Sequence, residues 1–266
     1  MMITPADVRA ALALPSMDAP VRRLPKDVLA QHSASNATDR KLIDGAIERL
    51  DWWATLSPAT VGIAQGVDDE RPVPALQLLT LTARAEPTQR LLTLIHRAVP
   101  VPIILVTALP DKAGTRVSLA PLRRAERIAG QMVVERVVVV PDLTRQDDPA
   151  TAAFLTSLAL PELPQTTLAA LYTALIERAE ALTVARLIGA PFQLLADTAA
   201  VAARRDALGR YALAEAELLT ARAAARGEKR LAAQVDLGNR VRSLKERLQA
   251  VAAELAEAPV AGPYLK

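Results

Sequence analysis

The hydrophobic pattern of this chain changes near Pro141, and this change constrains the fold more than any other feature. Between residues 59 and 142, short runs of leucine and β-branched residues are separated by turn residues, as is typical of strands. From Pro141 almost to the end, apolar residues recur every three or four positions, as is typical of helices. Strands followed by helices predict an α+β fold. We expect a mixed or antiparallel sheet with flanking helices, followed by a long C-terminal helical hairpin or coiled coil.

The first part of the chain begins with a predicted helix over Pro5–Leu14 and an extended segment over Val21–Lys26. A longer helix is predicted over Asn36–Trp53, because its apolar residues recur on one helical face. The adjacent Trp52 and Trp53 cannot both face the core from that helix. Apolar runs and turn residues predict the other elements: a helix over Gln89–Ala98, and strands over Thr60–Ala64, Ala75–Ala83, Val101–Leu109, Arg116–Pro121 and Met132–Val140.

The second part predicts helices over Ala150–Ser157, Gln165–Ile188 and Gln193–Ala225, with a break at Gly227 before a last helix. Apolar residues of the last helix have the alternating spacings of four and three that form a coiled-coil seam. They are Leu237, Val241, Leu244, Leu248, Val251 and Leu255. Two arrangements fit this seam. We favour an antiparallel hairpin with the preceding alanine-rich helix, and the alternative is pairing between chains, in a homodimer or with another protein.

These elements divide the chain into an N-terminal arm (1–38), an α+β domain (39–190), a helical coiled-coil arm (191–258) and a tail (259–266). With 266 residues, 51% of them hydrophobic, the chain has material for a core and is not intrinsically disordered. Its most apolar run, Ala98–Pro110, has 13 residues, whereas a membrane helix needs roughly 20. The N-terminus lacks the pattern of a signal peptide. We expect a cytoplasmic protein without membrane contact.

Composition excludes several kinds of site. The chain has no cysteine, hence no disulfide and no thiolate metal site. Its two histidines cannot supply a three-histidine zinc site. We interpret His96 as capping the end of a helix and His32 as a solvated loop residue. No glycine-rich phosphate loop and no hydrolase or metalloprotease motif is present. We expect no catalytic residues, no metal and no cofactor.

A nuclease of the restriction type is the one enzyme class that the strand pattern suggests. Such an enzyme would display an acidic residue on one strand and an acid-x-lysine on the next, but Ala75–Ala83 contains no carboxylate. The acidic turn Asp68, Asp69 and Glu70 could hold a cation, and we favour a solvated hairpin tip instead. A degenerate nuclease-like enzyme is therefore an alternative and not our first expectation.

Basic residues gather in three places. Arg22, Arg23 and Lys26 precede the predicted helix at 36, and Arg123, Arg124 and Arg127 follow a predicted hairpin. Each cluster could bind phosphate or an acidic partner, although we favour an ordered arm pinned by its apolar neighbours as the explanation of the first cluster. The net charge of +3 lies within residues 201–260, which hold eleven basic and eight acidic residues. We favour a solvated helix surface there. The alternative is sequence-nonspecific DNA binding through Arg222, Arg226, Lys229, Arg230, Arg240 and Arg242.

Four segments, in order along the chain, resemble the prokaryotic family called domain of unknown function four-three-nine-one. They are Arg23-Leu-Pro-Lys26, Trp53 followed by Leu56-Ser-Pro-x-Thr60, the strand entry Ala98-Val-Pro-Val-Pro-Ile-Ile-Leu-Val106, and Glu228-Lys229 with Val235-Asp236-Leu237. Two features depart from the family pattern. Leu29 and Ala30 stand where the family has an aromatic pair, and Gly238 stands where it tends to have asparagine.

The resemblance implies a context and no chemistry, because the family has no established catalytic residues. Its members accompany helicases and DNA methyltransferases in restriction-modification or phage-defence gene clusters. We therefore expect a non-catalytic accessory subunit of such a complex. Its α+β body would dock a helicase or methyltransferase, and its C-terminal helices would supply a coiled-coil arm.

Overall fold

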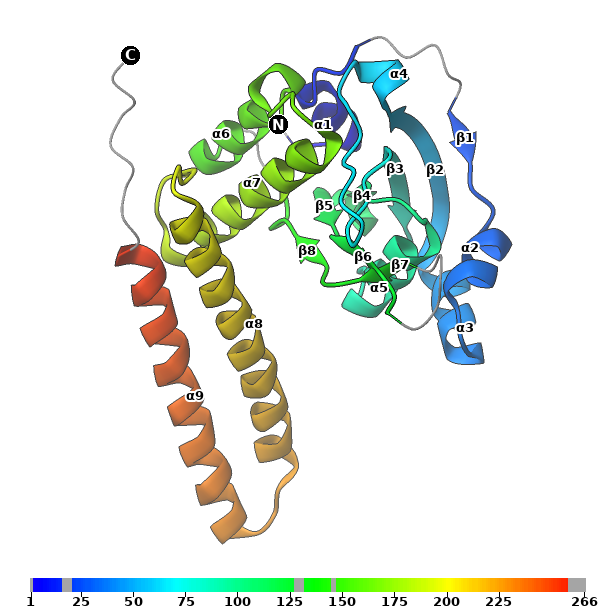
Figure 1. The fold of residues 1–266 in the computed structure, drawn as a ribbon. Coiled ribbons are helices and arrows are strands. Elements are labelled where there is room, and N and C mark those ends of the chain that lie inside the picture. Colours follow the sequence, from blue (N-terminus) through cyan, green and yellow to red (C-terminus); the bar gives the residue numbers. More distant parts are fainter. Residues whose placement is uncertain (1, 16–20, 127–131, 145–146, 258–266) are drawn as a thin grey trace. The chain divides into compact units, whose positions relative to one another are not determined.

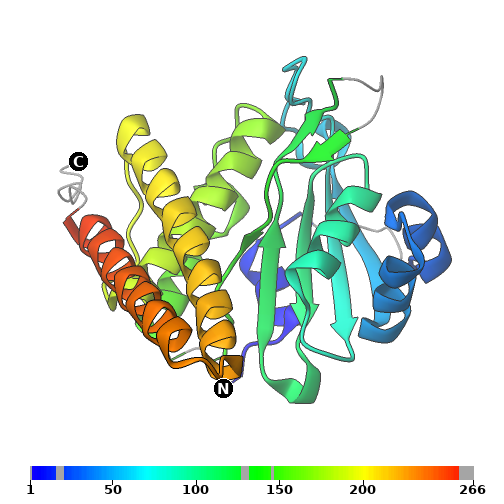
Figure 2. The same ribbon diagram turned by 90° about the horizontal axis from the view of Figure 1, so that it is seen from below.

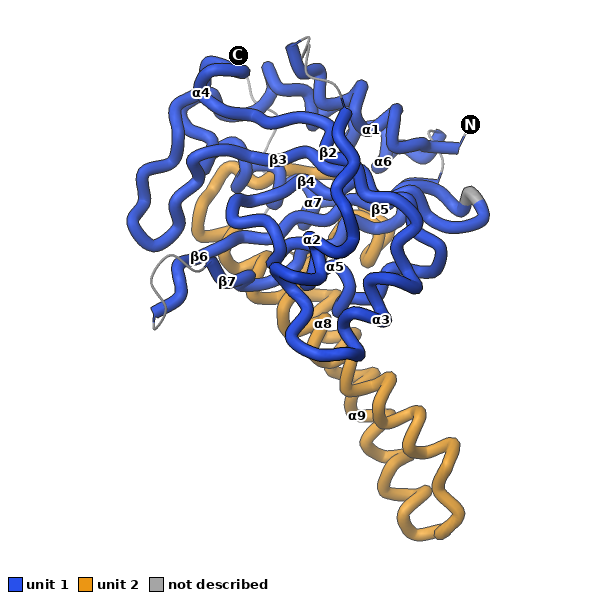
Figure 3. Tube along the Cα trace, turned by 90° about the vertical axis from the view of Figure 1, so that its right-hand side faces the viewer, with its two compact units in different colours: residues 1–182 blue, residues 183–266 orange. Residues whose placement is uncertain are grey.

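The computed structural model describes residues 2–15, 21–126, 132–144 and 147–257 (Figure 1). The chain divides into two compact units, Met1–Leu182 and Thr183–Lys266, which we call the sheet unit and the hairpin unit (Figure 3). The sheet unit combines a mixed sheet with helices, and the hairpin unit consists of long helices. The α+β class expected from the sequence is thus confirmed.

The main sheet has, within the described residues, six strands in the order β1-β2-β3-β4-β5-β8. The pair β3 and β4 is parallel and the other neighbours are antiparallel, so the sheet is mixed. A separate ribbon pairs β6 with β7. The strands are β1 (Arg22–Arg23), β2 (Ile47–Leu56), β3 (Leu76–Ala83), β4 (Ile103–Ala108), β5 (Thr115–Leu119), β6 (Leu122–Arg124), β7 (Met132–Val134) and β8 (Val138–Val139).

The helices of the sheet unit lie on both sides of the sheet. They are α1 (Pro5–Ala11), α2 (Lys26–Ser33), α3 (Ala37–Ala46), α4 (Pro58–Val61), α5 (Gln89–Ala98), α6 (Pro149–Ser157) and α7 (Leu168–Ile188, continuing into the hairpin unit), with short 3₁₀ turns η1 (Pro110–Lys112) and η2 (Leu160–Glu162). No helix in the described part of the chain is both long and apolar enough to span a membrane.

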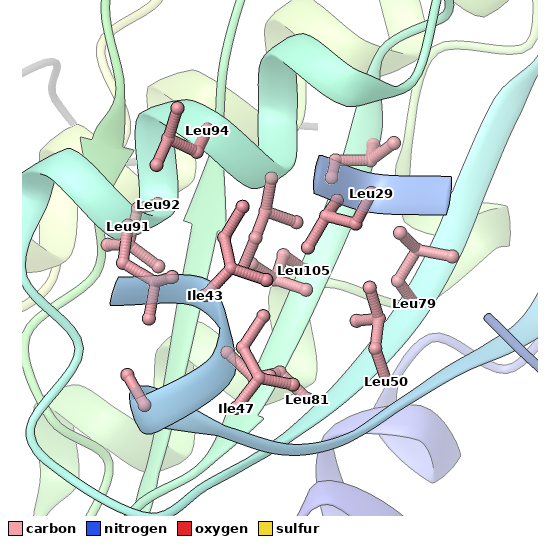
Figure 4. Packing of buried hydrophobic residues seen from close by; sticks show 13 residues of the cluster. Leu29, Ile43, Ile47, Leu50, Leu79, Leu81, Leu91, Leu92, Leu94 and Leu105 are labelled. Carbon is pink, nitrogen blue, oxygen red and sulfur yellow. The ribbon is translucent and has the colours of Figure 1, made fainter. Parts of the chain in front are cut away.

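One side of the sheet is sealed by α2, α3 and α5, and we call it the α5 side. Its leucines and isoleucines point toward one another in a single cluster (Figure 4). Leu50 of β2 and Leu79 and Leu81 of β3 are at most 2% exposed there. Burying such side chains contributes about 1.5–3 kcal/mol each. This cluster fixes which side chains of β2 and β3 point to the other side.

The other side of the sheet carries α1, α6 and α7, and we call it the α1 side. Val8 of α1, Phe154 of α6 and Leu175 of α7 surround a small apolar cavity with residues of β4 and β5. The Tyr172 hydroxyl of α7 accepts a hydrogen bond from the Ala120 backbone N–H (2.7 Å) and lies 2.9 Å from the Ile103 carbonyl oxygen. Burial raises the pKa of this phenol, so the hydroxyl keeps its proton. It ties α7 to the ends of β4 and β5.

The predicted helix over Asn36–Trp53 is wrong in its second half, because the chain changes from α3 to β2 at Ile47. Register shifts, which mark β-bulges, fall between Ile47 and Arg49 and between Trp52 and Ala54. A bulge inserts one extra residue into a strand, so neighbouring side chains on one side of the sheet become three positions apart in sequence instead of two. Ile47 and Leu50 therefore face the same cluster at a spacing that imitates a helix.

The predicted strand over Thr60–Ala64 is also wrong. Ser57 and Thr60 form a capping box that starts the short helix α4, and Gly62 ends it with a positive φ of 71°. Local capping thus prevails over the strand preference of the β-branched residues. The predicted strand Met132–Val140 is interrupted and becomes β7 and β8. The segment Val21–Lys26, which we expected to be extended, contains β1, and α2 begins at its last residue, Lys26.

The hairpin unit pairs α8 (Thr198–Gly227) with α9 (Leu231–Glu257), which run side by side in Figures 1 and 2. Arg210 contacts Glu254, and Arg247 lies 3.9 Å from Glu217, so the two helices are antiparallel. Five of the six seam residues pack against α8, with the last turn of α7 joining at one end: Val241, Leu244, Leu248, Val251 and Leu255. The sixth, Leu237, lines a groove with α8 residues. The favoured hairpin arrangement therefore forms within one chain.

Candidate binding surfaces

The first basic cluster does not converge on one surface. Arg22 and Arg23 are consecutive on β1, where side chains alternate between faces, so they point to opposite sides of the sheet. Arg22 pairs in register with Trp52, which packs against the α5-side cluster, and Arg23 pairs with Asp51. The Lys26 ammonium donates a hydrogen bond to the Asp44 carbonyl oxygen (3.1 Å), which ties α2 to α3. Arg23 is thus separated from the other two.

Arg23 joins a group of polar residues on the α1 side of β1, β2 and β3, which we call the polar sheet face. Register places Arg23, Asp51 and Thr80 in one row across the three strands. A second row holds Arg49 and Thr82. Adjacent strands are about 4.8 Å apart, so each three-strand row spans about 10 Å. The face consists of Arg23, Arg49, Asp51, Trp53, Thr80 and Thr82, all exposed or half-buried.

Trp53 reaches this face because of the second β-bulge. Trp53 and Ala54 together stand opposite Leu78, which turns Trp53 away from the α5-side cluster that holds Trp52. The guanidinium of Arg9, from α1, lies over the Trp53 ring at 4.2 Å from its centroid. A helix, a bulged strand and an edge strand therefore bring Arg9, Trp53 and Arg23 to one side of the sheet.

The second basic cluster lies on the β6–β7 ribbon. Arg123 and Arg124 are consecutive on β6 and so point to opposite faces of the ribbon. The Arg123 guanidinium lies 3.5 Å from a Glu126 carboxylate oxygen. Arg127 lies outside the described residues. The ribbon therefore brings no two described members of this cluster together on one face.

The basic residues of the hairpin gather at its tip, which we define as residues 222–242. This segment contains six basic and two acidic residues. One of the acids, Glu228, accepts the backbone N–H groups of Lys229 and Arg230 and so caps the start of α9. The six basic side chains are exposed and form no ion pair within the described part of the chain: Arg222, Arg226, Lys229, Arg230, Arg240 and Arg242.

These six do not share one face of the hairpin. Arg222 and Arg226 are four residues apart and lie on the same face of α8. Arg240 and Arg242 are two residues apart on α9, so about 200° of helix rotation separates them. Arg240 lines the groove beside Leu237. The tip is thus basic on several sides, and it does not present a single flat basic surface.

Large apolar side chains are also exposed on the hairpin. Leu219, Leu231 and Val235 lie at or beside the tip and are 62%, 76% and 56% exposed. Their seam-facing neighbours are already buried within the hairpin. The folding of the hairpin therefore does not need the exposed apolar residues. They lie at or beside the segment that carries the unpaired basic side chains.

The acidic turn stabilises its own loop. One Asp68 carboxylate oxygen accepts the backbone N–H groups of Glu70 and Arg71, each at 2.8 Å. These bonds lower the pKa of Asp68. Glu70 lies 3.4 Å from the Arg71 guanidinium, which also pairs with Glu135. Within the described residues, no group of three or more histidine, cysteine or acidic side chains could hold a metal ion.

His96 does not cap its helix as we expected. The ring lies under α5, 1% exposed, with Nε2 3.0 Å from the Ser118 hydroxyl of β5. Burial lowers the pKa of His96 to about 3. A neutral imidazole has no charge to place against the helix dipole, so its role is to join α5 to the sheet. His32 is exposed, on the last turn of α2 and not in a loop.

Sequence reasoning missed Arg9, Trp53 and Thr80 as members of a common surface. The helical spacing of residues 36–53 predicts a helix at Trp53, whereas Trp53 lies on β2 opposite β3. Arg9 is separated from Trp53 by more than forty residues, so no local spacing relates them. The available signal was the pair of charged residues Arg49 and Asp51, which are two positions apart and indicate a strand with one polar side.

A family model described as Domain of unknown function (DUF4391) matches residues 12–248. No curated protein and no solved structure shows significant similarity to the chain.

Proposed function

The chain belongs to this family of unknown function, and from that premise we propose that it is a non-catalytic accessory subunit that acts by binding. The complex is of the bacterial phage-defence or restriction-modification type. Its partner is a helicase or a DNA methyltransferase, the class that the family resemblance implies. The hairpin tip is the docking element for that partner.

The observation that carries the proposal is the coincidence of exposed apolar and unpaired basic side chains at the tip. Leu231 and Val235 are each more than half exposed although the hairpin seam is complete without them. An apolar centre surrounded by a polar rim is the usual composition of a protein interface. Six basic residues against two acidic ones fit an acidic surface on the partner.

A reconstitution with purified proteins tests the proposal. The chain is mixed with the helicase or methyltransferase encoded beside it, and affinity is measured for wild type and for the double variant Leu231→Ser, Val235→Ser. We expect at least tenfold weaker binding, about 1.4 kcal/mol, for the variant. Leu213→Ser is the matched control, because Leu213 is 56% exposed on the same hairpin outside the tip. Absence of binding by wild type, or an equal loss in the control, contradicts the proposal.

Direct DNA binding is the second candidate, favoured by the six unpaired basic residues of the tip. Their spread over several sides of the hairpin supports few simultaneous phosphate contacts, so we rank it below the protein partner. It predicts retention on duplex DNA at about 0.1 M salt, where the Debye length is about 10 Å. It also predicts that Arg222→Gln with Arg226→Gln lowers the salt dependence by roughly two phosphate contacts. No retention at that salt concentration excludes it.

A further inference from the structure

The polar sheet face is open, while the opposite side of the same strands is sealed. On the α5 side, Leu50, Leu79 and Leu81 are at most 2% exposed beneath three helices. On the α1 side, Asp51 and Thr80 are only half-buried, and Arg23 is exposed. The α1 side becomes apolar again toward β4, where Val106, in register with Thr80, is fully buried. The polar residues therefore occupy a defined corner of the sheet, bounded by its core.

Charge on this face is not balanced. Asp51 accepts a hydrogen bond from the Arg49 guanidinium (2.8 Å), so these two neutralise each other. Arg23 stands in register with Asp51 but forms no ion pair within the described residues. Arg9 has no carboxylate partner among those residues either. Two guanidinium groups, from β1 and α1, are therefore left without an anion.

The position of Arg9 over the Trp53 ring costs free energy. The Arg9 Nε lies covered by neighbouring atoms and has no hydrogen-bond acceptor in the part of the chain that the structure describes. A covered donor without an acceptor costs about 1–3 kcal/mol, which the contact with the Trp53 ring offsets in part. The guanidinium therefore gains free energy when it turns toward an acceptor brought to the face. Thr80 Oγ1, on the same side of the sheet, is also buried without a hydrogen-bond partner among the described residues.

The backbone is shaped at the same place. The two bulges of β2 bracket the row that contains Asp51, one before it and one after it. Bulges re-aim side chains and are frequent beside binding sites. Here the second bulge turns Trp53, which is half-buried, onto the face with its aromatic surface beside Arg9.

We propose that the polar sheet face binds a phosphate group of a nucleotide or of single-stranded nucleic acid, with Arg9 and Arg23 as the anion-binding residues and Trp53 as the stacking surface. The planar fork of arginine matches phosphate oxygens better than a lysine point charge does. Aromatic rings on open sheets provide stacking surfaces for unpaired bases. The hydroxyl of Thr82, which is half-buried, supplies a further donor.

This site is independent of the hairpin tip, because the variants that test each surface lie in different units. Loss of partner binding in the tip variant leaves phosphate binding on the sheet unchanged, and the reverse also holds. The two proposals therefore stand or fall separately.

The experiment uses the full chain with Trp52→Phe, so that Trp53 is the remaining tryptophan. Its fluorescence and, in parallel, the heat of binding are followed with inorganic phosphate, a nucleoside monophosphate and an oligodeoxythymidylate. We expect saturable binding that weakens at least tenfold in Arg23→Gln and in Arg9→Met. Methionine keeps a contact with the ring while removing the donors. Arg22→Gln is the matched control on the opposite face, with a change below twofold.

The ligand arms separate the two sources of phosphate. Equal affinities for the monophosphate and the oligonucleotide indicate a free nucleotide site, whereas much tighter binding of the oligonucleotide indicates a strand. Arg9→Lys keeps the charge but lacks Nε, so we expect an intermediate loss. Thermal unfolding of each variant confirms that the chain is folded. No saturable binding of any of the three ligands, or equal effects of Arg22→Gln and Arg23→Gln, overturns the proposal.

Discussion

Arg116 of the sheet unit and Arg222 of the hairpin show how differently the two units hold the same side chain. Arg116 donates hydrogen bonds to Asp142 at 2.6 and 2.9 Å and also reaches Glu86. Arg90 pairs in the same bidentate way with Asp39, which lowers the pKa of that carboxyl. Arg222 is exposed and unpaired within the described residues.

The difference lies in what each unit needs for folding. In the sheet unit, arginines join elements that are distant in sequence, as Arg136 joins the segment before β8 to Glu180 of α7 at 2.7 Å. In the hairpin, two adjacent helices are joined by an apolar seam and by the contacts Arg210–Glu254 and Arg247–Glu217, whereas the arginines of the tip form no such pair within the described residues. Charge that folding does not use is available for binding. The basic residues of the hairpin tip, and Arg9 and Arg23 on the polar sheet face, form no ion pair within the described residues.

The largest expected effect comes from truncating the core of each unit. We expect Leu81→Ala, in the sealed α5-side cluster, to destabilise the chain by about 2–5 kcal/mol. We expect Leu244→Ala, in the hairpin seam, to cost less, because its α8 neighbours include alanine and the seam can close. Denaturant unfolding gives both values, and amide exchange shows whether the second loss stays within α8 and α9. Equal global losses would contradict the contrast between a deep core and a thin seam.

Prediction from sequence worked where one local pattern determines the structure. The seam from Leu237 to Leu255 follows from spacing alone, because i, i+3 and i+4 positions share a helix face. The strand β4 follows from a nearly all-apolar run that both sides of the sheet bury. It failed at β2, where a bulge gave Ile47 and Leu50 helical spacing.

The polar sheet face was not predictable for a related reason. Its members come from α1, β1, β2 and β3, and only the register between strands places Arg23 beside Asp51 and Thr80. A strand shifted by one residue would send every side chain to the other face. Adjacent basic residues such as Arg22 and Arg23 suggest a cluster in sequence, yet the strand separates them. The tip was easier, because all its charges lie within one hairpin.

A smaller effect is expected from removing one buried hydroxyl of the sheet unit. Tyr172→Phe keeps the packing of the ring but leaves the Ala120 N–H and the Ile103 carbonyl without this partner. The expected loss is about 1–3 kcal/mol, because buried polar groups without hydrogen bonds are costly. Tyr211→Phe is the control in the hairpin, where the side chain is only partly buried. Denaturant midpoints compare the two. A loss in Tyr211→Phe as large as that in Tyr172→Phe would remove the distinction.

The pH dependence of stability should originate in the sheet unit, which contains the buried His96. His96 titrates near 6.5 when unfolded and near 3 when folded, so between these values only the unfolded chain binds its proton. Stability is therefore expected to fall as pH decreases from 6.5, by up to about 1.4 kcal/mol per pH unit. His96→Gln keeps a hydrogen-bonding group near Ser118 without titration and should flatten this slope. Unfolding curves measured between pH 7 and pH 4 give this slope, because in roughly this range only the unfolded chain binds the proton. An unchanged slope in the variant would show that His96 is not its source.

The smallest expected effect, and the one with opposite signs in the two units, comes from glycine substitution. Gly238 lies within α9, and a Cβ added there would meet no atom within 4 Å. Alanine restricts the unfolded chain more than glycine does, so Gly238→Ala should stabilise the hairpin by about 0.5–1 kcal/mol. Gly66 of the sheet unit is different, because a Cβ there would lie 2.6 Å from the Ala169 Cβ. Gly66→Ala should therefore destabilise, since α7 would have to move away from the loop. Thermal unfolding of both variants tests the pair. A gain in stability for both variants would mean that the space at Gly66 is as open as that at Gly238. A loss in both would mean that the surface of α9 at Gly238 is already occupied.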